Sequence, residues 1–176
     1  MGDHLLYCPK GSPRGWRHDS HKLLLASDLQ KAARHPVVEP HQGTHRVRPD
    51  IKALGSNGGT DFYDIVFVHS LTPARMPTVA RNPCGPVNLA KNHKIQHYSS
   101  FMDAQGSRAR LVPVALSTLG GWHPEAYKFV AGLAESIATR SAVPVPYAKY
   151  TMFSRYAANL VRNNAVCLLE GVVTEV

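Results

Sequence analysis

The chain has 176 residues, 44% of them apolar, which suits one domain or one domain with a small appendage. It contains no apolar run long enough to span a membrane, and its three widely spaced cysteines exclude a disulfide framework and favour an intracellular, reducing location. Twenty Lys and Arg against twelve Asp and Glu give a net charge of +8, which is typical of a polyanion binder. Because the basic residues are dispersed, charge alone only favours nucleic acid as the partner.

The first part of the chain predicts an irregular segment followed by a helix. Residues 1–19 are rich in Gly, Pro, Arg and His, and we expect no regular structure there. Ser20 is suited to cap a helix that runs to about Arg34 and is ended by Pro36. Residues 37–47 then predict a short strand and a loop.

A β-hairpin is predicted next, with strands at about 47–54 and 61–69 around the turn residues Asn57-Gly58-Gly59. Pairing that is symmetric about Asn57 places Asp50 opposite Asp64. Two like charges in that position are destabilising, and Asp64 lies in an otherwise apolar run. A divalent cation shared by both carboxylates would remove both objections. The alternative is a different register, with Asp50 in a turn and Asp64 at a strand edge.

The rest of the chain predicts one connection and four regular elements. In order, these are a Pro-rich connection at 72–86, a helix at 87–103, a strand at 110–118, a helix at about 124–140 and a helix at about 147–169. The last helix is expected to bury a stripe made of Tyr150, Phe153, Ala157, Leu160, Val161 and Leu168. This order of elements predicts an α/β or α+β domain.

Four motifs occur in a characteristic order. They are Pro49-Asp50 followed by Asp64, then Lys91-Asn92-His93-Lys94 with Tyr98, then Leu119-Gly120-Gly121-Trp122-His123-Pro124, and finally residues 154–165. In this order, the chain resembles, over about residues 1–170, the restriction-like endonucleases of the PD-(D/E)xK superfamily at the C-terminal end of LINE-type (non-LTR) retrotransposon polyproteins. The acidic pair is a weak signal by itself, whereas its order with the lysine helix and the Gly-Gly turn is more specific.

The resemblance implies an α/β fold with a restriction-endonuclease-like core, made of a helix, a β-hairpin with a further strand, a helix and a strand, plus two C-terminal helices. It divides the chain into a zinc-knuckle remnant at 1–19, the endonuclease-like core at 20–122 and a C-terminal helical extension at 123–176. It also implies a DNA endonuclease that nicks its target by phosphodiester hydrolysis, with DNA, or RNA, as the partner. The reverse transcriptase portion of a parent polyprotein and a nuclear location belong to the same expectation.

The implied catalytic chemistry uses two carboxylates and a lysine. Asp50 and Asp64 would hold Mg²⁺ or Mn²⁺. In the common superfamily motif the lysine lies two residues after the second acid, but Val66 stands there, so Lys94 or Lys91 would supply the charge from the helix. Alternatively, these lysines belong to a solvated helix face. The side chains expected to contact nucleic acid are Tyr98, Arg48, Arg155 and Arg162.

Near the N-terminus, His4 and Cys8 match the second half of the family's Cys-Cys-His-Cys zinc knuckle. Two ligands do not close a tetrahedral site, so zinc is not expected in this truncated form, and the chain is expected to be a fragment of a longer element. Ser117 stands where many relatives carry an acid, and Glu39 is the candidate substitute. Two other interpretations therefore remain, a catalytically decayed nucleic-acid-binding remnant and a purely structural protein with an exposed apolar patch.

Overall fold

The computed structural model describes residues 13–40 and 47–173. A four-stranded mixed sheet has the order β1-β2-β3-β4, in which β1, β2 and β3 are antiparallel neighbours and β4 runs parallel to β3. The strands are β1 (Val37–Val38), β2 (Ile51–Leu54), β3 (Thr60–Val68) and β4 (Ala109–Ser117). The protein is therefore of the mixed α/β class, as predicted.

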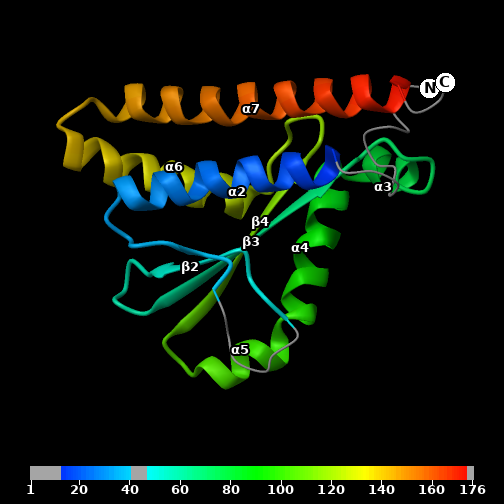
Figure 1. Ribbon diagram of the computed structural model, residues 1–176. Coiled ribbons are helices and arrows are strands. Elements are labelled where there is room, and N and C mark those ends of the chain that lie inside the picture. Colours follow the sequence, from blue (N-terminus) through cyan, green and yellow to red (C-terminus); the bar gives the residue numbers. More distant parts are fainter. Residues whose placement is uncertain (1–12, 41–46, 174–176) are drawn as a thin grey trace.

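Helices cover both faces of this sheet (Figure 1). Helices α2 (Pro13–Lys31), α6 (Pro124–Ser141) and α7 (Val145–Val173) pack together on one face. Helices α3 (Met76–Arg81), α4 (Gly85–His97) and α5 (Ser99–Gln105) connect β3 to β4, and α4 packs against both of these strands on the other face. None of the helices in the described ranges is long and apolar enough to cross a membrane.

The predicted hairpin register is correct. Ile51 pairs with Tyr63 and Leu54 with Thr60, so the next pair in this register is Asp50 with Asp64. Gly58 has a positive φ of 76°, which favours glycine at the turn. Gly59 lies against the loop that precedes β4, where a Cβ on it would be 2.1 Å from the carbonyl oxygen of Arg108. The turn residues therefore fix the pairing that brings the two aspartates together.

The main core lies between the sheet and the helices α2, α6 and α7. Leu25 and Leu29 of α2, Ile51 and Tyr63 of the hairpin, and Leu133 of α6 are all almost fully buried there. The two C-terminal helices thus share one hydrophobic core with the strands that carry the aspartates.

Three predicted elements differ from the structure. Helix α2 begins at Pro13, so residues 13–19 are helical and Ser20 lies inside the helix; proline is favoured at a first helical position. The connection 72–86 contains α3 and the start of α4. The helix predicted at 87–103 is two helices, α4 and α5, with Tyr98 between them.

The predicted apolar stripe of the last helix is only partly correct, since Leu160 is buried and Phe153 packs against the core. Tyr150 is 74% exposed and Val161 68% exposed, whereas other positions face the core. The buried residues of α7 are Ala148, Met152, Tyr156, Leu160, Asn163 and Cys167. They recur every three or four residues, as on one helix face, but three of them are small or polar, so apolarity alone did not identify this face.

Candidate functional site

The two hairpin aspartates converge on one site. Asp50 lies just before β2, and its backbone N–H donates to the carbonyl of Tyr63, the partner of Ile51, at 3.0 Å. The side-chain Oδ2 of Asp50 accepts from the backbone N–H of Ile65, the residue after Asp64, at 2.7 Å. Asp64 is deeply buried, with a side chain 4% exposed. The two carboxylates are therefore held side by side by the register of the hairpin.

A lysine from the opposite helix reaches the buried aspartate. Lys94 of α4 places its Nζ 2.8 Å from Oδ2 of Asp64, and its own side chain is 26% exposed. The hydroxyl of Tyr98 donates to Oδ1 of Asp64 at 2.6 Å and also lies 2.8 Å from the carbonyl oxygen of Arg48. The break between α4 and α5 positions this tyrosine, which is 2% exposed.

The pKa of Asp64 is raised despite these two donors. Burial is the largest cause, and the negative charge of Asp50 acts in the same direction, while Lys94 and Tyr98 act against them. The pKa of the Tyr98 hydroxyl is raised as well, by burial and by the neighbouring Asp64 charge, so this hydroxyl remains a donor. The site thus holds a carboxylate whose charge is incompletely compensated by the protein.

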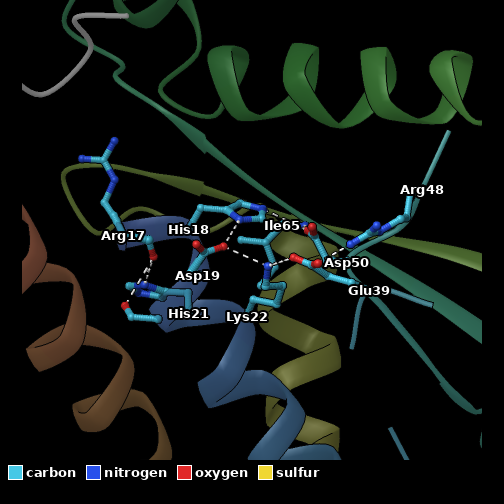
Figure 2. Close-up of polar contacts among 10 residues, drawn as sticks. Arg17, His18, Asp19, His21, Lys22, Glu39, Arg48, Asp50 and Ile65 are labelled. Atoms are coloured by element: carbon cyan, nitrogen blue, oxygen red, sulfur yellow. Dashed lines mark hydrogen bonds and ion pairs between the residues drawn. The ribbon is translucent and has the colours of Figure 1, made fainter. Parts of the chain in front are cut away.

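His18 of α2 is a member of the site that the sequence did not reveal. Its Nε2 lies 3.0 Å from Oδ2 of Asp50 (Figure 2), and this hydrogen bond to Asp50 is the largest of the causes that raise the pKa of His18. Residues 13–19 were expected to be irregular, so no helix face was assigned to His18. The available signal was the i, i+4 spacing of His18 and Lys22, which places both on the same face of a helix.

The edge of the site next to Asp50 carries a network of charges (Figure 2). The backbone N–H of Glu39 donates to the carbonyl of Asp50 at 2.7 Å, so the strand of Glu39 does lie alongside. The Glu39 carboxylate, however, pairs with Arg48 and with Lys22, whose Nζ lies at 2.5 Å. Glu39 is thus already engaged by two cations, and Arg48 by Glu39.

The remaining predicted residues lie elsewhere. Lys91 pairs with Glu125 at 2.6 Å and is not brought to the aspartates. Arg155 of α7 contacts the buried Asp28 at 2.7 Å, whereas Arg162 is exposed. Ser117 pairs with Val68 in the sheet and accepts a hydrogen bond from Ser70 at 3.0 Å, far along the strand from Asp64. His4 and Cys8 lie outside the described residues.

The donor set at the aspartates suits a hard divalent cation. Over residues 13–40 and 47–173, no cluster of three or more His, Cys, Asp or Glu side chains is arranged to hold a metal ion. Mg²⁺ does not require one, because it is commonly held by one or two carboxylates together with waters and substrate phosphates. The two adjacent carboxylates, with Asp64 incompletely neutralised, fit this kind of binding.

No protein-family model and no curated protein matches this chain.

Proposed function

We propose that this chain is a metal-dependent DNA endonuclease domain of the restriction-like type, derived from a non-LTR retrotransposon, that nicks DNA by phosphodiester hydrolysis. The observation that carries the proposal is the convergence of Asp50 and Asp64 on one site with Lys94 ion-paired to Asp64. Three residues meet there, one just before β2, one in β3 and one in α4, in the chain order of the motifs that carry the resemblance. A structural role for the pair alone is disfavoured because two adjacent carboxylates destabilise the ladder.

Each residue has a distinct role in this proposal. Asp50 and Asp64 would hold Mg²⁺ or Mn²⁺, which when bound supplies an activated water and stabilises charge on the scissile phosphate. Lys94 presents a positive charge at the edge of the same site, where charge develops on phosphate oxygens. Tyr98 and the Ile65 N–H hold the two carboxylates in their orientation. His18 fixes Asp50 from the side of α2.

The net charge of +8 supports binding of a polyanion. Of the side chains expected to contact DNA, Arg162 is exposed and Arg48 lies at the edge of the site, paired with Glu39. Tyr98 and Arg155 instead make buried contacts with aspartates, which gives them structural roles. DNA is the proposed partner, with the reverse transcriptase portion of a parent polyprotein and a nuclear location as parts of the same proposal.

A second candidate is a nucleic-acid-binding remnant that has lost catalysis. Two observations favour it: His18 and Lys94 already occupy one oxygen of each carboxylate, and Ser117 supplies no acid near Asp64. The fold and the net positive charge would then be retained without metal binding.

Plasmid nicking distinguishes the two candidates. With Mg²⁺ or Mn²⁺ the wild-type protein should nick supercoiled plasmid, EDTA should stop the reaction, and Asp64→Asn should abolish it. Asp103→Asn, at an exposed acid of α5, is the matched control and should nick normally. If the wild type binds DNA with a steep salt dependence but does not nick it, the second candidate, a nucleic-acid-binding remnant without catalysis, is supported. Nicking by Asp64→Asn would exclude the proposed mechanism.

A further inference from the structure

A cavity lies on the face of the sheet opposite Asp64, between α6 and the edge strand β4. It has a volume of about 460 Å³ and is lined by Arg34, Arg110, Lys128, Val112, Phe129 and Leu133, among others. Because side chains alternate along a strand, Asp61 and Tyr63 face α6, whereas Asp64 faces α4. The cavity is thus separated from the aspartate pair by the sheet itself.

The walls of this cavity carry an excess of positive charge. Asp61, which is 1% exposed, accepts hydrogen bonds from Nε and NH2 of Arg110 at 3.0 and 2.8 Å, and its Oδ2 lies 3.7 Å from NH1 of Arg34. One carboxylate faces two guanidinium groups, and Lys128 adds a third cation. Glu125, which also lines the cavity, is paired with Lys91 at 2.6 Å. The cavity is therefore cationic overall.

The two arginines are held in place before any ligand arrives. Asp61 fixes Arg110 through two parallel hydrogen bonds, and the hydroxyl of Tyr63 lies 3.3 Å from NH1 of Arg34. Guanidinium groups fixed in this way bind phosphate with a smaller loss of conformational entropy, and each retains further N–H donors.

The other walls suit an apolar or planar group. Val112 and Phe129, which are partly buried, supply apolar surface beside the cations, and the volume lies in the range of small-molecule sites. Gly132 also lines the cavity, and a Cβ placed on it would meet nothing within 4 Å, so its missing side chain leaves this space open. A ligand with a phosphate and an attached nucleoside matches both parts of the lining.

We propose that this cavity binds the phosphate group of a nucleotide, either free or at the end of a nucleic-acid strand. This site does not depend on the endonuclease proposal, since it uses none of the same residues. Addition of an acidic peptide as a strand on the edge of β4 is disfavoured, because Pro113 in the middle of that strand has no N–H to donate.

Calorimetric titration of the full chain in EDTA tests the proposal with four probes: inorganic phosphate, 5′-dAMP, a 5′-phosphorylated DNA hexamer and the same hexamer without that phosphate. Lys128→Ala should weaken binding of 5′-dAMP by about fivefold to tenfold, as expected for one lost charge-assisted contact. Arg140→Ala removes an equal charge from the end of the same helix, outside the cavity, and should change the affinity little. Gly132→Leu should fill the space and weaken binding without changing the charge.

The probes also identify the source of the phosphate. The cavity is assigned to strand ends if the phosphorylated hexamer binds at least tenfold more tightly than 5′-dAMP and also more tightly than the unphosphorylated hexamer. Equal affinity for 5′-dAMP and the phosphorylated hexamer assigns it to free nucleotides. Equal losses in Lys128→Ala and Arg140→Ala, or full binding by Gly132→Leu, would overturn the proposal. Binding of the probes in EDTA and plasmid nicking with Mg²⁺ are measured separately, so a failure of the endonuclease proposal is distinguished from a failure of this one.

Discussion

Lys94 and Asp64 form an ion pair of 2.8 Å between helix α4 and strand β3. The strand position two residues after Asp64, where the common superfamily motif has its lysine, is occupied by the partly buried Val66. A lysine on the facing helix can thus deliver its charge to the same carboxylate from a different part of the chain. Lys91, one turn earlier, points to Glu125 and does not share this role.

The first prediction compares these two lysines. Lys94→Met should reduce the rate of plasmid nicking by about a hundredfold or more, since a charge placed where negative charge develops is worth several kcal/mol. Lys91→Met should reduce it much less, because that lysine neutralises an exposed glutamate. Rates are measured under single-turnover conditions with saturating Mg²⁺. Equal losses in both variants would show that the general positive charge of α4 matters and not the ion pair with Asp64.

The second prediction follows from the raised pKa of Asp64, whose main cause is burial. A raised pKa in the folded state means that the fold favours the protonated acid, so this contribution to stability is present below the ordinary pKa of 3.8 and is lost as the pH rises through the folded-state pKa. Asp64→Asn should therefore melt at a higher temperature than the wild type at pH 7 in EDTA. The difference should shrink toward pH 4, as measured by differential scanning calorimetry. A lower melting temperature at pH 7 would show that the Lys94 ion pair outweighs the cost of burial.

The position of the acidic pair was predictable from the sequence, because it depends on a local turn. Asn57, Gly58 and Gly59 fix the register, and the register brings Asp50 opposite Asp64. The partners of these acids were harder to predict, because they come from distant helices. Ser20 was expected to begin helix α2, but His18 lies on the helical turn before it. Which of Lys94 and Lys91 reaches Asp64 depends on the rotation of α4 about its axis. The local sequence pattern does not determine how a helix is rotated about its axis or how deeply it packs against the sheet.

The third prediction concerns Tyr98, which the sequence predicts to contact nucleic acid. Its hydroxyl lies within hydrogen-bonding distance of the Arg48 carbonyl and of Asp64, and its ring is buried. Tyr98→Phe should lower the free energy of unfolding by about 1–3 kcal/mol, because it leaves buried acceptors unpaired. The salt dependence of DNA binding should not change. A shallower salt dependence would instead assign Tyr98 to a contact with phosphate. Tyr150→Phe, at an exposed tyrosine, is the control and should alter neither quantity.

The fourth prediction uses His18, whose pKa is raised chiefly by its hydrogen bond to Asp50. A raised histidine pKa stabilises the fold fully below the ordinary value of 6.5, and this contribution is lost as the pH rises through the folded-state pKa. The loss of stability on His18→Gln should therefore be larger at pH 5.5 than at pH 8.5. Urea unfolding of both proteins at the two pH values measures this difference. His35→Gln, at an exposed histidine, is the control variant in the same measurement. A loss that is the same at both pH values would show that the imidazolium makes no favourable pair with Asp50.

The fifth prediction separates the two arginines of α7 that the sequence assigned to nucleic acid. Arg155 lies 2.7 Å from the fully buried Asp28, whereas Arg162 is exposed. Arg155→Ala should lower the free energy of unfolding by about 3 kcal/mol, because it removes the closest cation from a buried carboxylate and leaves Lys31 at 3.8 Å and the neighbouring Tyr156 hydroxyl. Arg162→Ala should change stability by less than about 0.5 kcal/mol. If Arg162 contacts a DNA phosphate, its removal should also lower the slope of log K against log salt by about one unit. Unfolding in urea and DNA binding at several salt concentrations measure both effects, and an equally stable Arg155→Ala protein would show that Asp28 does not require its partner.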